Sequence, residues 1–175
     1  MIKRIFLIAQ KEFKRYFDSP IAYITILVFL LISGWMFSST LFLMNRATIQ
    51  NFAVNVPLLL LFLAPAIAMQ LLAGEFNQGT MEVLGSLPVK DEEIIAGKFI
   101  AAFALMSLAI ILTLIYPITV ASLGKFDWGQ GVGTYLGMIL IGGAFLAAGL
   151  FASALTSNQV VAFILGFLFS FTLFL

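Results

Sequence analysis

Acidic residues are scarce in this 175-residue chain, and five of the eight lie within residues 74–98. These five are Glu75, Glu82, Asp91, Glu92 and Glu93. Carboxylates perform general acid–base chemistry when a substrate and a second catalytic group are positioned beside them. The chain contains no His and no Cys, which excludes zinc clusters, haem ligation, disulfides and Ser-His or Cys-His nucleophiles. Asp91, Glu92 and Glu93 are consecutive and precede an apolar run, a pattern typical of the first turn of a helix. We therefore expect no catalytic residue and no metal site.

The glycine-rich segments do not match a nucleotide-binding loop. Such a loop requires the pattern GxxxxGK[ST], and the nearest segment, from Gly79 to Ser86, lacks the lysine and the spacing. The segment from Gly131 to Gly137 misses the dinucleotide-binding spacing and leads into an apolar run. The formal net charge is only +1, and no basic surface interleaved with aromatic residues is apparent, so nucleic acid is not an expected partner. We predict that the chain is not an enzyme and binds no cofactor itself.

The composition is that of a membrane protein. Hydrophobic residues make up 62% of the chain and charged residues 10%, against roughly 45–50% and about 25% in soluble domains. A helix needs about 20 apolar residues to cross a hydrocarbon core about 30 Å thick. The predicted spans are residues 21–43, 56–73, 99–123, 135–155 and 160–175. Their continuous apolar blocks differ from the alternating pattern of a membrane β-barrel. The predicted fold is an all-α, polytopic membrane helix bundle, with residues 1–175 forming one transmembrane domain.

The last predicted span has 16 residues and stops within an apolar run. A helix of that length rises about 24 Å, which is short for a membrane crossing. We therefore expect the domain to be truncated, with at least one further helix following Leu175.

The distribution of basic residues predicts how the chain is oriented in the membrane. Five precede the first span and two more, Lys90 and Lys98, lie between the second and third, whereas only Arg46 and Lys125 lie in the opposite loops. Because positive residues favour the cytoplasmic side, the N-terminus and residues 74–98 are predicted to be cytoplasmic.

Residues 1–19 are predicted to form an amphipathic helix at the membrane interface. Apolar residues recur there at spacings of three and four, and the five basic residues lie mainly on the other side. Asp18, Ser19 and Pro20 would then turn the chain into the membrane. Two roles are open from the sequence: an anchor that sets topology, or an element that transmits motion from a cytoplasmic partner.

The connector between the second and third spans, residues 74–98, is predicted to be cytoplasmic and to contain a short helix. Residues 80–87 can form about two turns with Met81, Leu84 and Leu87 on one side, and Pro88 would end them. One interpretation is a solvated loop that happens to fold. The other is a lever that a soluble partner grips.

Three segments carry a resemblance to a known family: KEFKRYFDSPIAYI at 11–24, GEFNQGTMEVLGSLPVKDEEIIAGKF at 74–99 and YPITVASLGKFDWGQGVGTYLG at 116–137. They resemble the permease subunits of ABC-2 type transporters, and among these the gliding-motility-associated bacterial permeases. The most specific part of the resemblance is the order of residues in the second segment. An acid comes first, followed by Gly-Thr, by any residue and Glu, by a small residue and Leu-Pro-Val, by consecutive acids, and finally by Gly-Lys. Relatives usually carry basic residues where this chain has Asn77 and Gln78, and often an Arg near Gln70.

The resemblance implies a transporter subunit of the bacterial cytoplasmic membrane. Such permeases are similar to one another in having six membrane helices, an amphipathic N-terminal helix and a cytoplasmic coupling helix; this chain would supply five of the six. Two permeases, as identical copies or homologues, form a pathway, and two separate ATPase subunits bind ATP and Mg²⁺. On this resemblance the coupling residues are Glu75, Gly79, Thr80, Glu82, Leu84 and Pro88. The alternative is a non-transporting scaffold that anchors a cytoplasmic ATPase in surface assembly or gliding motility.

Within the predicted spans, polar residues are few. Gln70 and Thr113 could contact a transported substrate, and the absence of charge inside every span argues against a secondary transporter. Small residues at Gly133, Gly137 and 142–154 predict a smooth surface for close helix packing. Three prolines, Pro57, Pro65 and Pro117, are expected to kink their helices.

Overall fold

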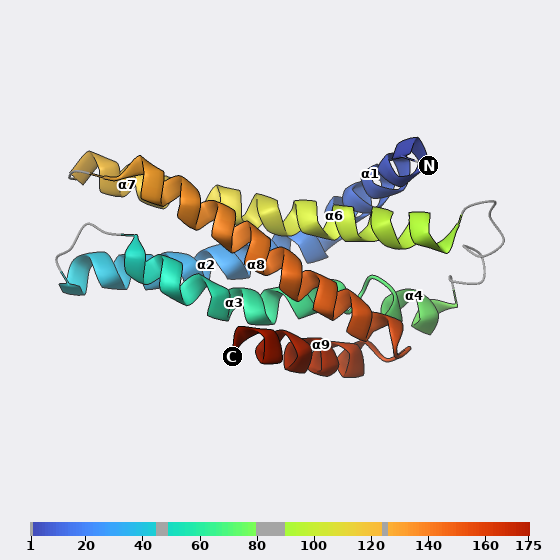
Figure 1. Cartoon of the computed structure of the whole chain (residues 1–175). Helices are drawn as coiled ribbons and strands as arrows, with labels where there is room; N and C mark the ends of the chain where they lie inside the picture. Colours follow the sequence, from blue (N-terminus) through green and yellow to red (C-terminus); the bar gives the residue numbers. More distant parts are fainter. Residues whose placement is uncertain (1, 45–48, 80–89, 124–125) are drawn as a thin grey trace.

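The computed structural model describes residues 2–44, 49–79, 90–123 and 126–175, and these residues form helices joined by turns. Figure 1 shows the long helices lying side by side along one direction, with α1 at an angle to them. The helices are α1 (Ile2–Asp18), α2 (Pro20–Met44), α3 (Gln50–Ala68), α4 (Ala73–Gln78), α6 (Asp91–Leu112), α7 (Ile115–Leu123), α8 (Trp128–Ala154) and α9 (Gln159–Phe174). No strand occurs in the described ranges, which confirms the all-α prediction.

Four helical stretches in the described residues are long and apolar enough to cross a membrane. They are Ala22–Leu41, Phe52–Gln78, Asp91–Leu123 and Trp128–Ala154. The helix α9 is apolar but has only 16 residues, shorter than a typical crossing. The five-span prediction counted this helix as a span, whereas length and composition support four.

Helix breaks divide two of the predicted spans. The predicted span 56–73 includes the turn between α3 and α4, and the predicted span 99–123 includes the turn between α6 and α7. Pro117 has no N–H to donate to the carbonyl of Thr113, four residues earlier. That carbonyl accepts instead from the Tyr116 N–H at 2.9 Å and from the Tyr135 hydroxyl of α8 at 2.8 Å. Pro57 and Pro65 lie inside α3 without ending it.

Glycines bring α8 close to its neighbours. A Cβ added at Gly149 would lie 2.7 Å from the Cβ of Ala68 on α3, and one at Gly142 would lie 2.8 Å from the Met106 side chain of α6. On the α9 side, a Cβ at Gly166 would approach the Cα of Gly149 at 3.2 Å. The predicted packing surface within 142–154 is thus occupied by helices of the same chain, whereas an added Cβ at Gly133 would meet nothing within 4 Å.

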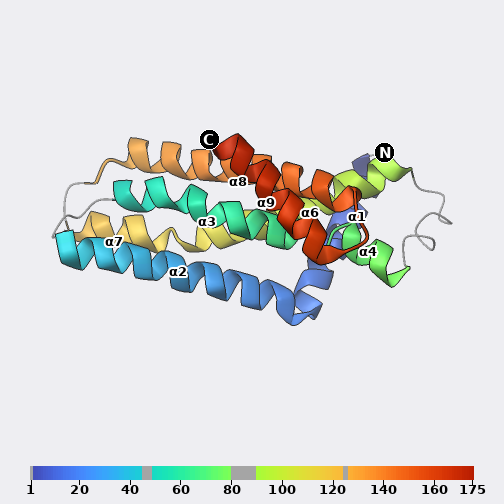
Figure 2. The ribbon, with the colours of Figure 1, turned by 90° about the horizontal axis from the view of Figure 1, so that it is seen from below.

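The N-terminal helix α1 packs against the start of α6. A Cβ at Gly97 would lie 2.6 Å from the Ile8 side chain and 3.2 Å from the backbone oxygen of Ile5, so only glycine allows this close approach. Figure 2 shows α1 at the end of the bundle where α4 ends and α6 begins. This contact places one face of α1 beside the two helices that flank residues 80–89.

Candidate functional site

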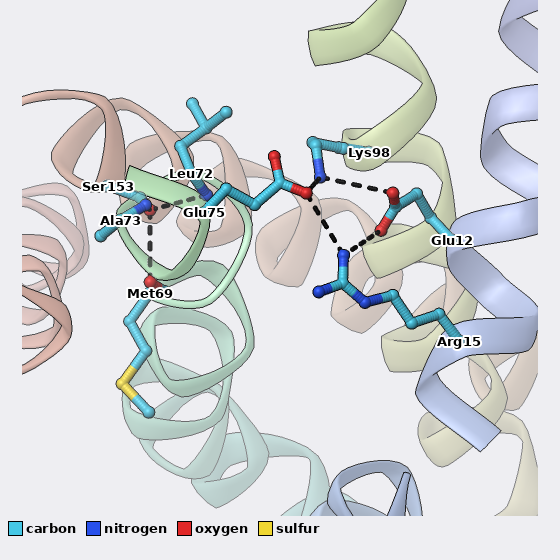
Figure 3. Close-up of polar contacts among 8 residues, drawn as sticks. All are labelled: Glu12, Arg15, Met69, Leu72, Ala73, Glu75, Lys98 and Ser153. Atoms are coloured by element: carbon cyan, nitrogen blue, oxygen red, sulfur yellow. Dashed lines mark hydrogen bonds and ion pairs between the residues drawn. The ribbon is translucent and has the colours of Figure 1, made fainter. Parts of the chain in front are cut away.

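Four charged side chains meet at that end of the bundle, and we call them the charged cluster: Glu12, Arg15, Glu75 and Lys98 (Figure 3). They come from α1, α4 and α6. Lys98 Nζ lies 2.6 Å from Glu75 Oε1 and 3.4 Å from Glu12 Oε1. Arg15 Nη1 lies 3.2 Å from Glu75 Oε1 and 3.7 Å from Glu12 Oε2. Each cation therefore contacts both carboxylates, and these contacts join α1, α4 and α6.

Burial makes the cluster energetically significant. The Lys98 side chain is 2% exposed and that of Glu75 is 4% exposed. A buried charge is tolerated only when it is paired, and removing one partner of a buried pair typically costs about 3–5 kcal/mol. With two acids and two bases, the cluster has no formal net charge. It therefore fixes the relative positions of its helices more than it attracts a charged ligand.

The helix α4 is positioned by a side chain from α8. The Ser153 hydroxyl accepts from the backbone N–H groups of Leu72 at 3.2 Å and Ala73 at 2.9 Å, and donates to the Met69 carbonyl at 3.4 Å. These contacts satisfy backbone groups left free where α3 stops and α4 starts (Figure 3). Glu75 lies in the first turn of α4, so Ser153 indirectly sets the place of its carboxylate.

The start of α6 confirms the predicted role of the three consecutive acids. Asp91, Glu92 and Glu93 occupy its first turn, and Glu93 Oε2 accepts from the Lys90 backbone N–H at 3.4 Å. Arg4 of α1 lies 3.9 Å from the same carboxylate oxygen. Two turns further along α6, Lys98 enters the charged cluster. Glu93 is thus part of helix capping and of the α1–α6 contact, and all three acids lie where the helix dipole favours carboxylates.

A polar cavity of about 270 Å³ adjoins the cluster. Its walls include Glu12, Arg15, Tyr16, Ser19, Gln70, Leu71, Gly74, Gln78, Lys98 and Gln159. Burial, and after it the carboxylate of Glu12, raises the pKa of Tyr16 above its usual value of 10. The Tyr16 hydroxyl is therefore neutral at physiological pH and can both donate and accept a hydrogen bond.

The structure locates some of the sequence-predicted site residues. Glu75 lies in the charged cluster, and Gly79 ends α4 with a left-handed φ of 68°. Gln70 lines the polar cavity. Thr113 is buried and its hydroxyl lies 3.0 Å from that of Tyr135, about 22 Å of helix rise beyond Lys98. The remaining four, Thr80, Glu82, Leu84 and Pro88, lie outside the described residues.

Sequence reasoning did not single out Glu12, Arg15, Lys98 or Ser153. A signal for Lys98 was present, because Glu75 and Lys98 stand near the two ends of the segment that carries the family resemblance. A cation adjoining a membrane span needs a partner, and Glu75, near the other end of residues 74–98, is an acid that adjoins the preceding span. Ser153 had no such signal, since serine is common among small residues in membrane helices.

Comparison with known proteins agrees with this architecture. A family model described as "ABC-2 family transporter protein" matches residues 6–175, which include the charged cluster and all four long apolar stretches. No curated protein and no solved structure matches the chain. Since the match spans nearly the whole sequence, the chain belongs to the ABC-2 family of transporter proteins.

Proposed function

We propose that this chain is the permease subunit of an ATP-binding cassette transporter, and that it couples ATP hydrolysis on a separate subunit to substrate export. Family membership supports an ATPase partner, which would hold the ATP and Mg²⁺. The observation that carries the coupling proposal is the buried pair of Glu75 and Lys98. The two residues lie on the helices that lead into and out of residues 80–89.

The contacts favour joint movement of the helices around this connector. Lys98 and Glu75 join α6 to α4, Glu12 and Arg15 join both to α1, and Ser153 joins α4 to α8. Packed interfaces of this kind shift between discrete arrangements and do not bend continuously. Closure of the ATPase subunits would push residues 80–87, and the charged cluster would pass that displacement to α1, α4 and α6 together.

Under this proposal the membrane is the bacterial cytoplasmic membrane and the charged cluster lies at its cytoplasmic side. The excess of basic residues near that end supports the orientation. A second permease, identical or homologous, would complete the pathway, and Gln70 at the cavity and Thr113 at the α6–α7 break are its proposed polar contacts. The narrower assignment to gliding-motility permeases rests on the sequence resemblance alone.

Co-expression with the ATPase encoded beside it tests the proposal. We expect the two proteins to co-purify from membranes in equal numbers, and the assembled complex to hydrolyse ATP faster than the ATPase alone. Replacing Glu82 with Lys, or Thr80 with Pro, should abolish this stimulation without reducing membrane insertion. Asp127→Asn, an acid at the opposite end of the bundle, is the matched control.

Two results would contradict the proposal. If no ATPase accompanies the chain, family membership reflects fold alone. If the ATPase binds but transport and stimulated hydrolysis are unaffected by Glu82→Lys and Thr80→Pro, the chain acts as a scaffold for that ATPase.

A further inference from the structure

We propose that the polar cavity beside the charged cluster binds the phosphoethanolamine group of a membrane lipid. This inference depends on the chain lying in a membrane and not on ATP coupling. The cavity wall is built where apolar helices begin or end: Ser19 precedes α2, Gln70 follows α3, and Gln159 opens α9. Lipid headgroups lie at that level of a bilayer. A cavity of about 270 Å³ is below the roughly 300–1,000 Å³ of pockets that enclose whole small molecules, and suits a polar fragment of a larger one.

The cavity offers donors for a phosphate. The Arg15 guanidinium uses Nη1 for both Glu12 and Glu75, and its side chain is 56% exposed (Figure 3). Its other N–H groups point away from the two carboxylates, and a guanidinium has five donors in all. Three amides, from Gln70, Gln78 and Gln159, also line the cavity. The structure gives none of these three side chains a hydrogen-bond partner within the described ranges, so their amide groups are available to a ligand.

The cavity also offers acceptors for an ammonium group. The Glu12 carboxylate lines it with 14% of its side chain exposed, and a carboxylate accepts about four hydrogen bonds. The amide oxygens of the glutamines and the Tyr16 hydroxyl add further acceptors. Because the charged cluster is formally neutral, its field favours a zwitterion over an anion. A primary ammonium donates hydrogen bonds that a quaternary choline cannot, so phosphatidylethanolamine is favoured over phosphatidylcholine.

Lipid retention by the intact chain measures this preference. The protein is purified in detergent and incubated with phosphatidylethanolamine, phosphatidylcholine or phosphatidylglycerol of equal acyl chains, and the lipid retained is counted by native mass spectrometry. We expect phosphatidylethanolamine to be retained about tenfold better than either of the others, the effect of one charge-assisted hydrogen bond. The double variant Gln70→Leu/Gln159→Leu removes two amides while leaving the charged cluster intact, and should lose the preference. Gln130→Leu, an exposed amide at the far end of α8, should keep it.

Each remaining outcome overturns part or all of the assignment. Equal retention of all three lipids, or a preference that survives Gln70→Leu/Gln159→Leu, excludes the cavity as a headgroup site. Phosphatidylglycerol retained as well as phosphatidylethanolamine excludes recognition of the ammonium. Water-soluble glycerophosphoethanolamine is tested in parallel: if it displaces the lipid at equal concentration, the ligand is a soluble solute of the same chemistry and the lipid assignment is wrong.

Discussion

The ammonium of Lys98 and the carboxylate of Glu75 lie 2.6 Å apart, buried, at the two ends of the stretch that the family resemblance singles out. The residues between them include 80–87, the segment that an ATPase partner is proposed to push. The contact joins α4 to α6 on either side of residues 80–89. The first prediction concerns that contact.

Glu75→Gln and Lys98→Met should each destabilise the chain by up to about 3–5 kcal/mol, because each removes the shortest contact of the cluster. The buried charge that remains keeps only its longer contact, Lys98 with Glu12 or Glu75 with Arg15. The double variant Glu75→Gln/Lys98→Met retains the Glu12–Arg15 pair and should recover at least half of that loss. Thermal unfolding of the detergent-solubilised protein measures all three. Additive losses in the double variant would show that the two side chains do not stabilise each other.

Gly97→Ala should weaken the packing of α1 on α6 by about 1–3 kcal/mol, since the added methyl would overlap the Ile8 side chain. Shortening the neighbour in Gly97→Ala/Ile8→Ala should restore little of the stability, because alanine keeps the Ile8 Cβ at 2.8 Å and the Ile5 backbone oxygen stays at 3.2 Å. Gly137→Ala is the control: its Cβ would meet nothing within 4 Å, so the higher helix propensity of alanine should add up to about 1 kcal/mol. Equal responses at Gly97 and Gly137 would be inconsistent with the described α1–α6 contact.

Ser153→Ala should loosen the turn between α3 and α4, because two buried N–H groups lose their acceptor. The expected cost is about 1–3 kcal/mol. Hydrogen exchange at Leu72, Ala73 and Glu75 should accelerate while exchange in α9 stays unchanged. Ser122→Ala removes an exposed hydroxyl whose partner is local, and should leave the exchange of α4 as it is. Faster exchange throughout the chain in Ser153→Ala would point instead to global unfolding.

Comparing Tyr135→Phe with Thr113→Val distinguishes a structural role of Thr113 from contact with a transported substrate. The hydroxyl of Tyr135 contacts both the Thr113 carbonyl and its side chain, so its removal should destabilise the α6–α7 break by about 1–2 kcal/mol. If Thr113 contacts substrate, Thr113→Val should alter transport in the assembled complex more than Tyr135→Phe does at matched stability. The same transport for both variants would leave Thr113 with a structural role only.

Much of the architecture could be predicted from the sequence because membrane helices obey a simple length and polarity rule. Apolar runs located the long helices, and the consecutive acids located the start of α6. The breaks at 69–72 and 113–114 were not predicted, since they depend on Ser153 and Tyr135, which supply hydrogen bonds from a different helix. The charged cluster was missed for a similar reason: pairing Glu12 with Lys98 requires knowing that α1 crosses α6 at Gly97.

The contact of α1 with α6 also constrains the order of assembly. Glu12 and Arg15 are synthesised long before Lys98, and α2 and α3 must enter the membrane in the interval. Closing so long a loop carries an entropic cost before the cluster can form, so α1 cannot reach its final site until α6 is in place. The Ser153 hydroxyl, which accepts from the Leu72 and Ala73 N–H groups, becomes available later still, after α8 has been synthesised. This end of the bundle is therefore completed late, and an intermediate that lacks α6 would leave the α6-facing side of α1 uncovered.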